Sequence, residues 1–231
     1  METTLHRQLK ALYVDDPERR EVTVDGFRID AVVDGTLVEI QCASLSAIRD
    51  KVRRLLDRHA VRVVKPLAAR KLLVTRQRKN GPVVSQRHSP SRATAFQIFD
   101  ELVHFVTVFP HERLTLEVLL VDVEEHRLRR KPRRWRGKDY RVQDRLLRSV
   151  AERREFRTAS DLLAFLPAGL PEEFTTADVA ELASVPRWLA QKAAYCLTET
   201  GAVACVERRG RLRLYRRNDD AVHPARIRRA A

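Results

Sequence analysis

The sequence is poor in the residues that mark several common classes of protein. Only three of its 231 residues are cysteines, Cys42, Cys196 and Cys205, and they form no C-x-x-C pair. This spacing argues against a zinc site or a disulfide framework. The seven histidines are scattered without ligand-like pairing, so each is expected to be structural or solvated. Buried free thiols are typical of the reducing cytoplasm, which is therefore the expected location.

Long apolar runs are also missing. No stretch of about 18 apolar residues occurs, so no membrane span is expected, and the first residues lack the apolar core of a signal peptide. The N-terminus instead carries Leu5, Leu9 and Leu12 at helical spacing, with Thr3 or Thr4 placed to cap a helix. The chain is expected to begin with a short amphipathic helix.

Acidic residues are too few to balance the basic ones. The chain has 45 Lys and Arg against 31 Asp and Glu, a net charge of +14 and an isoelectric point near 10.5. Such an excess bears on partners rather than on fold. Nucleic acid is the first candidate and an anionic membrane surface the second. Within the first class, RNA is an alternative to DNA, but no RNP-like aromatic motif supports it.

The first half alternates between strand and helix patterns. Asp25-Gly26 and Asp34-Gly35 are tight-turn signals, and they divide residues 20–42 into three antiparallel strands. A helix over 44–59 and a short strand over 61–66 follow, and a helix between two strands predicts that these strands are parallel. The other elements expected here are a hairpin over 69–90, a helix over 92–109 and a strand over 113–128.

A strongly basic segment suggests the domain boundary. Residues 127–139 read as a basic linker between a first domain over 1–126 and a second over 140–217, with a polar tail over 218–231. Within the linker, Arg133 and Arg134 are candidate DNA contacts. The second domain is expected to be mainly helical and to begin with a helix over 140–154.

The second domain has a specific order of elements. Thr175 or Thr176 caps a short helix, a tight turn leads to Pro186, and a second helix ends at Gly201. Two strands joined by a basic tip follow. This order over 140–217 resembles a winged helix-turn-helix domain, in which the second helix enters the DNA major groove and the wing contacts the backbone. The implied DNA contacts are Arg187, Gln191, Lys192, Arg208, Arg209 and Arg211. The alternative is a winged helix that binds protein.

Two carboxylates lie in the three-strand meander. Asp30 falls at the end of the second strand and Glu39 within the third, with a two-residue turn between the strands. Antiparallel pairing brings them together, and the backbone carbonyl of Ile40 adds a third oxygen. Hard oxygen ligands suit Mg²⁺, which keeps several waters and activates one for attack on a phosphodiester.

These residues, in "ID" followed by "VEIQ", resemble the PD-(D/E)XK nuclease superfamily, which includes restriction enzymes and repair nucleases. The resemblance implies an α/β fold with a mixed sheet and an αβββαβ core. It also implies cleavage of DNA with Mg²⁺ or Mn²⁺, with Asp30 and Glu39 as metal ligands. Gln41 stands where the family has lysine, so it would orient water without adding charge. Lys51, or else Arg49 or Lys65, would supply the missing cation.

Two hypotheses follow from the sequence. The first is a cytoplasmic, metal-dependent nuclease that binds double-stranded DNA through the winged helix. Cutting both strands would require two centres, which makes a homodimer plausible. The second is a non-catalytic DNA-binding regulator or adaptor with a degenerate nuclease-like domain, and Gln41 is the residue that favours it.

Overall fold

The computed structural model describes residues 3–130, 139–210 and 212–218, and it divides the chain into two compact units. Each unit is assembled from three separate stretches of sequence. The first unit consists of Met1–Cys42, Val64–Ala95 and Val118–Arg154. The second consists of Ala43–Val63, Phe96–Glu117 and Glu155–Ala231. The described residues contain no helix with the length and apolar character needed to cross a membrane.

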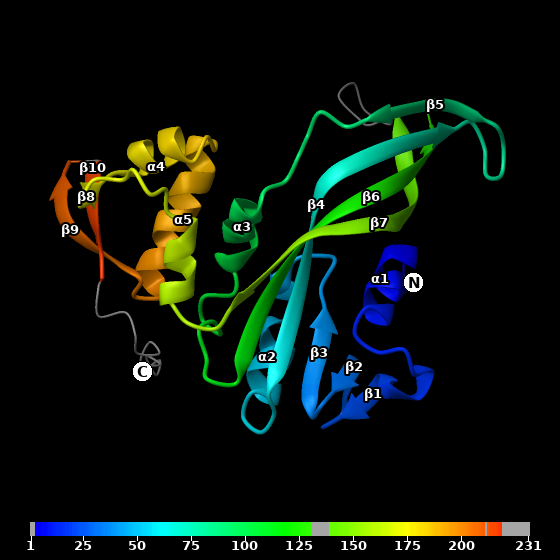
Figure 1. Ribbon diagram of the computed structural model, residues 1–231, viewed down its shortest axis with the longest axis horizontal. Coiled ribbons are helices and arrows are strands. Elements are labelled where there is room, and N and C mark those ends of the chain that lie inside the picture. Colours follow the sequence, from blue (N-terminus) through cyan, green and yellow to red (C-terminus); the bar gives the residue numbers. More distant parts are fainter. Residues whose placement is uncertain (1–2, 131–138, 211, 219–231) are drawn as a thin grey trace. The chain divides into compact units, whose positions relative to one another are not determined.

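A large mixed sheet makes this an α+β fold (Figure 1). Its strand order is β1-β2-β3-β4-β6-β7, with β5 paired to β4 beyond the end of β3. In Figure 1 the arrows of β3 and β4 point the same way, which confirms the predicted parallel pair. The strands are β1 (Arg20–Val24), β2 (Phe27–Val33), β3 (Thr36–Ile40), β4 (Val61–Arg76), β5 (Val83–His88), β6 (Leu114–Arg129) and β7 (Tyr140–Phe156).

Two tight turns set the register of the first three strands. Asp25 and Gly26 have φ of 48° and 78°, and Asp34 and Gly35 have φ of 48° and 77°. Positive φ at both central residues defines the type I′ turn, whose twist matches that of antiparallel strands. The predicted three-strand meander is therefore confirmed. A short 3₁₀ turn at Pro17–Arg19 leads into it.

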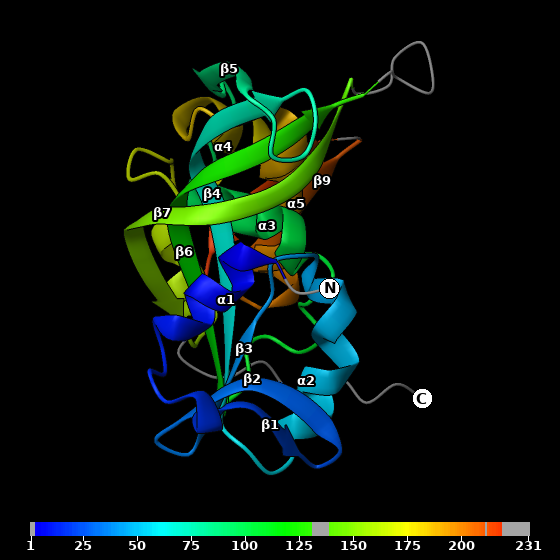
Figure 2. The same ribbon diagram turned by 90° about the vertical axis from the view of Figure 1, so that its right-hand side faces the viewer.

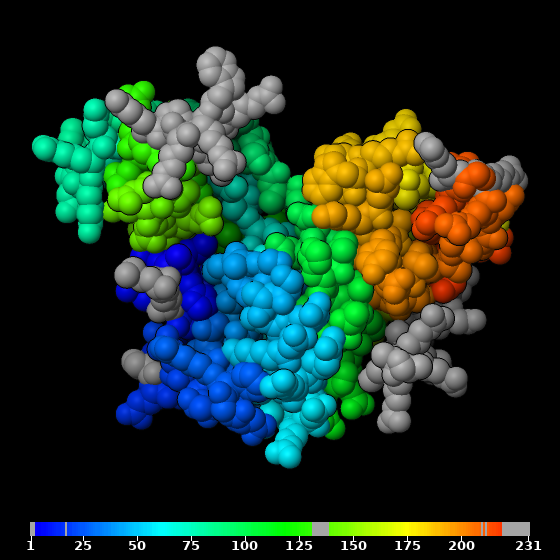
Figure 3. All heavy atoms as spheres, turned by 180° about the vertical axis from the view of Figure 1, so that it is seen from behind, coloured from blue at the N-terminus to red at the C-terminus, as the bar shows by residue number. Residues whose placement is uncertain are grey.

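Helix α1 (Thr4–Ala11) covers one face of the sheet in the first unit (Figure 2). Figure 3 shows the N-terminal segment, in dark blue, at the molecular surface. The Thr3 hydroxyl accepts a hydrogen bond from the His6 N–H and caps the helix, as predicted. The apolar side of α1 forms a core with residues from four strands. That core contains Leu5, Leu9, Val14, Ala31, Val38, Ile40, Val64, Leu119, Val121 and Val123.

The helix predicted over residues 140–154 is wrong, because this segment is strand β7. Its Leu147 and Val150 have helical spacing, but both pack against the core beneath α1. The Leu147 N–H donates to the Gln8 side chain at 2.8 Å. Most residues of strand β6 are buried, and without β7 its edge would leave backbone groups unpaired. Sheet pairing thus outweighs the local helical preference.

Two further boundaries differ from the prediction. Strand β4 runs through Pro66 instead of ending there, and it supplies the first half of the predicted β4–β5 hairpin. The predicted boundary at 127–139 does not divide the two units, because the described residues on both sides of it belong to the first unit. Strand β6 pairs with β7, and the Arg130 N–H donates to Asp139 O at 2.7 Å.

The second unit is mainly helical. Its largest core feature is an aromatic cluster, which we define as Phe96, Phe99, Phe156 and Phe165, with ring centroids 5.0–6.2 Å apart. Its helices are the 3₁₀ turn η2 (Leu45–Ile48), α2 (Arg49–Leu55), α3 (Ile98–Leu102), the 3₁₀ helix η4 (Ser160–Phe165), α4 (Thr176–Leu182) and α5 (Arg187–Glu199). A 3₁₀ turn at Ala95–Gln97 precedes α3.

A small antiparallel sheet completes the second unit. Its order is β8-β10-β9, formed by β8 (Glu173–Phe174), β9 (Val203–Arg209) and β10 (Leu212–Arg217). Thr175 and Asp178 form a reciprocal capping box at the start of α4. Pro186 precedes α5 as its N-cap, one position earlier than predicted, and Gly201 follows the helix with φ of 79°. The predicted order of helix, turn, helix and hairpin is therefore present.

Candidate metal centre and nucleic-acid interface

The two candidate metal ligands adjoin the last register pair of β2 and β3. Ala31 pairs with Val38; Asp30 precedes Ala31 in β2, and Glu39 follows Val38 in β3. Both residues are largely buried: the Asp30 side chain is 14% exposed, and Glu39 as a whole residue is 9% exposed. The close approach of the two carboxylates predicted from the turn length stays a prediction.

Three groups contact Asp30. Its Oδ2 lies 3.1 Å from His6 Nε2 and accepts the Ile40 backbone N–H at 2.8 Å, and its Oδ1 lies 3.8 Å from Lys10 Nζ. Burial, the largest single influence, raises the pKa of Asp30. The hydrogen bonds from His6 and Ile40 and the positive charges of His6 and Lys10 lower it. Their combined effect is larger than that of burial, so the pKa of Asp30 falls below its ordinary value. Asp30 is therefore ionised at neutral pH.

A buried lysine connects this aspartate to a second acid. Lys10 is only 4% exposed, and its Nζ lies 2.7 Å from Glu21 Oε1. Glu21 has φ of 57° and lies across from Asp30, between the register pairs Arg20–Ala31 and Val22–Ile29. Hydrogen bonds from Lys10 and then Arg28 lower the pKa of Glu21 to about 2. Sequence reasoning missed this cluster, although His6 and Lys10 are spaced four residues apart on α1.

The described residues offer few ligands for a metal ion. No group of three or more His, Cys, Asp or Glu side chains placed to hold a metal occurs in the described residues. Mg²⁺, however, is commonly bound through one or two carboxylates, with water completing its shell. Asp30 and Glu39 are carboxylate ligands of the type that this ion prefers.

The residues predicted to assist catalysis lie in different units. The Gln41 N–H donates to Val64 O at 2.9 Å, which joins the end of β3 to β4. Lys65 follows Val64 directly and is 3% exposed, so a buried cation lies next to Gln41 in the strand pairing. Lys51 and Arg49 lie on α2 in the second unit. Of the cations proposed from sequence, the structure therefore brings Lys65 to the end of β3.

Helix α5 presents a polar row to solvent. Arg187, Gln191 and Tyr195 are exposed and spaced four residues apart, so they lie on one face of the helix. Lys192 points elsewhere: its Nζ forms an ion pair with Asp100 on α3 and lies 5.4 Å from the centre of the Trp188 ring. Cys196, one turn further, donates its thiol to Phe99 O. One side of α5 is thus anchored on α3, while the row faces away.

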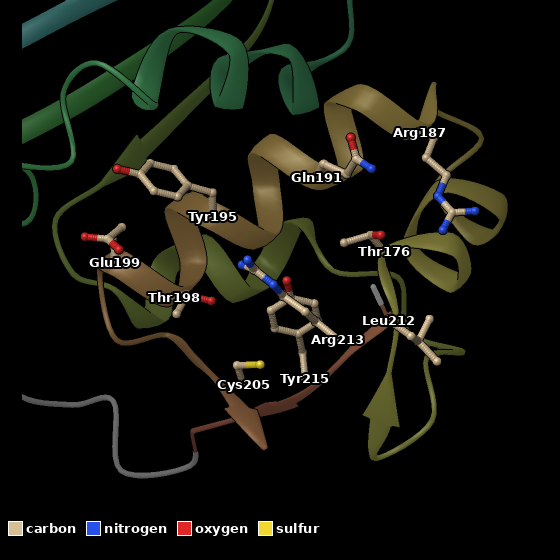
Figure 4. A pocket seen from close by; sticks show the side chains of 10 residues that line it. All are labelled: Thr176, Arg187, Gln191, Tyr195, Thr198, Glu199, Cys205, Leu212, Arg213 and Tyr215. Atoms are coloured by element: carbon tan, nitrogen blue, oxygen red, sulfur yellow. The ribbon is translucent and has the colours of Figure 1, made fainter. Parts of the chain in front are cut away.

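A groove of about 340 Å³ lies between this row and the β9–β10 hairpin (Figure 4). Figure 4 shows Arg187 and Gln191 on α5, with the side chain of Arg213 extending from β10 toward the helix. The other lining residues are Thr176, Tyr195, Thr198, Glu199, Cys205, Leu212 and Tyr215. The groove therefore joins both elements that were predicted to contact DNA.

The hairpin carries opposed arginines. Arg208 on β9 pairs directly with Arg213 on β10, and both are exposed. Like charges directly opposite each other destabilise a sheet. The side chain of Arg209 and the residues Arg211, Arg133 and Arg134 lie outside the described part of the chain, so their predicted contacts remain predictions.

These features define an α+β protein with a mixed sheet and a helical unit that carries a basic hairpin. Residues 3–157 match the family described as "Domain of unknown function (DUF8091)", and the chain belongs to this family. It is also similar to an uncharacterized protein of Treponema pallidum (strain Nichols). The two are 33% identical over 217 residues, covering 94% of this chain and 85% of that protein. No solved structure matches the chain.

Proposed function

We propose that this protein binds duplex DNA through α5 and the β9–β10 hairpin. The observation that carries the proposal is the placement of Arg187 and Gln191 beside Arg213 around one groove. Arginine and glutamine donate hydrogen bonds to base edges and phosphates, and arginine does so with a fixed charge. The opposed Arg208–Arg213 pair, unfavourable in the isolated protein, would be offset by phosphate.

The order of elements in the second unit supports the same function. A helix, a short strand, two helices and a hairpin follow one another, and the short strand β8 pairs with β10. This arrangement resembles a winged helix-turn-helix domain, in which the second of the two helices enters the major groove. The net charge of +14 adds sequence-independent affinity for DNA.

We further propose that the first unit is a PD-(D/E)XK-like nuclease, because the two largely buried carboxylates Asp30 and Glu39 adjoin the Ala31–Val38 register pair. Asp30 and Glu39 would hold Mg²⁺ or Mn²⁺, which supplies an activated hydroxide and stabilises charge on the phosphodiester. Gln41 would orient water through its amide, and Lys65 would supply the charge absent from Gln41. His6 and the Ile40 amide hold the Asp30 carboxylate in place.

DNA binding is tested by fluorescence anisotropy of a labelled duplex. Arg187→Ala with Gln191→Ala is expected to weaken binding, at roughly 1–3 kcal/mol for a base contact. Arg54→Ala, which removes an exposed arginine of α2 in the same unit, is the matched control. Equal affinities for the wild type, the double variant and the control would refute the proposal.

Catalysis is tested with linear, supercoiled and branched DNA, with Mg²⁺ or Mn²⁺ and with EDTA. Wild-type protein is expected to cut in a metal-dependent manner, while Asp30→Asn and Glu39→Gln bind DNA normally without cutting. If the wild type binds DNA but cuts none of these substrates, the nuclease proposal fails. The protein would then be a DNA-binding regulator or adaptor with a degenerate nuclease-like unit.

A further inference from the structure

A second basic hollow lies in the first unit, away from the Asp30–Glu39 pair in the sheet. It has a volume of about 230 Å³ and lies where the β4–β5 and β6–β7 hairpins meet. We call it the hairpin hollow. Its lining residues are Thr75, Val84, Ser85, Arg87, Arg127, Arg129, Asp139 and Tyr140. Neither the proposed helix-and-hairpin interface nor the proposed nuclease centre uses any of them.

Strand alternation explains why this face is polar. On β6, Leu119, Val121 and Val123 belong to the core beneath α1. Alternate residues of a strand share a face, so Arg127 and Arg129 continue the same side of β6. Leu128, between these two arginines, is buried. The sheet face thus changes from apolar to basic along β6.

The neighbouring hairpin adds hydroxyl groups and another cation. Thr75 on β4 pairs directly with Ser85 on β5, and Arg87 lies two residues beyond Ser85 on the same face. Every residue of β5 is exposed, and Val84 remains 45% exposed at the edge of the hollow. Cations, hydroxyls and an apolar patch therefore converge from β4, β5 and β6.

The charges in the hollow are only partly neutralised. Arg127 hydrogen-bonds Glu125 and lies 3.8 Å above the Tyr140 ring, which fixes its guanidinium. Glu125 also accepts from Arg145, so it is shared between two arginines. Arg87 and Arg129 are exposed, and among the described residues that line the hollow Asp139 is the one acid. Three arginines against one aspartate give this site an excess of positive charge.

We propose that the hairpin hollow binds the phosphate backbone of DNA as a second contact, separate from α5. Arginine guanidinium groups suit phosphate oxygens, because they donate parallel hydrogen bonds with a fixed charge. The Thr75 and Ser85 hydroxyls add neutral donors, and Val84 provides an apolar surface for deoxyribose. This inference rests on the proposed DNA binding and extends it to a second segment of the same molecule.

The test compares full-length variants by anisotropy titration on a duplex at several salt concentrations. Arg87→Ala with Arg129→Ala is expected to lower the slope of log K against log salt by about 2, since each phosphate contact contributes about 0.9. The affinity loss between about 50 and about 200 mM salt then shrinks by roughly tenfold. Arg19→Ala with Arg70→Ala, two exposed arginines of the first unit outside the hollow, is the matched control.

The outcomes separate this inference from the DNA-binding proposal. If the Arg87/Arg129 variant keeps the wild-type slope while the Arg187/Gln191 variant binds weakly, the hollow is not a DNA contact and the proposed function stands. If neither variant differs from wild type, both proposals fail. Each variant is also titrated with phosphatidylserine vesicles. If the Arg87/Arg129 variant binds DNA like the wild type but loses binding to the vesicles, the hollow is refuted as a DNA site. Thermal melting of each variant confirms that it is folded.

Discussion

Replacement of Phe99 by alanine tests whether α3 and the C-terminal segment share one core. Phe99 is 0% exposed, and its ring lies edge-on to Phe96 at 5.1 Å and to Phe165 at 5.2 Å. Removal of a buried phenylalanine side chain costs about 3–5 kcal/mol, because both transfer energy and packing are lost. In a protein of this size, 1 kcal/mol corresponds to about 2–4 °C in melting temperature. A decrease on the order of 10 °C is expected.

The assay is urea and thermal unfolding followed by circular dichroism. Phe99→Leu keeps most of the volume and should cost less than about 1.5 kcal/mol. Tyr195→Ala removes an aromatic ring that is 46% exposed and serves as the control. A double-mutant cycle of Phe99→Ala and Phe165→Ala should show a coupling of about 0.5–1.5 kcal/mol for one aromatic pair. Additive effects, with Phe99→Ala no worse than Tyr195→Ala, would refute the shared core.

Three other predictions concern local features. Lys10→Met should raise the pKa of Glu21 from about 2 toward its ordinary 4.5, as measured by carbon-13 NMR titration of the side chain. Because the folded-state pKa is the lower one, the stabilisation by this carboxylate is complete above about pH 5. It is lost as pH falls through 4.5 toward 2, and acid unfolding of the wild type should show a loss that the variant lacks. Burial raises the pKa of Cys196 to about 12 and that of Cys42 to about 11, so at pH 8 a thiol reagent should label the exposed Cys205 first, as read by peptide mass spectrometry. Rapid labelling of Cys196 in folded protein would contradict its burial. Thr175→Ala removes the capping box of α4 and should lower the free energy of unfolding by about 1 kcal/mol in a urea titration, whereas Thr176→Ala should have a smaller effect.

The parts of the fold that sequence could predict depend on neighbouring residues. The two Asp-Gly turns need positive φ at both central positions, and an Asp-Gly pair in the sequence is typical of such turns. The Thr3 cap and the placement of Asp30 one step beyond the Ala31–Val38 pair follow from the same short-range rules. The order of elements from α4 to β10 was likewise predictable, because caps and glycines mark each boundary.

The parts that sequence could not predict depend on distant residues. Residues 140–156 form a strand because they pair with the edge of β6, and local helix propensity contains no information on this pairing. His6 and Asp30 are 24 residues apart, and Lys192 and Asp100 are 92 apart, so no local pattern links them. Asp30 and Glu39 could thus be proposed from sequence as metal ligands, whereas the contacts of His6 and Lys10 with Asp30 could not be predicted.

The division of each unit into three stretches has a consequence for synthesis on the ribosome. Leu45 and Ile48 belong to the second unit, but α5 of that unit ends only at Glu199. About 150 residues must be added between them, which takes roughly 10–30 s at typical elongation rates. During that interval the first stretch of the second unit has no completed partner. This chain must therefore finish folding after its last helix emerges, and a truncated nascent chain would expose apolar residues to chaperones and proteases.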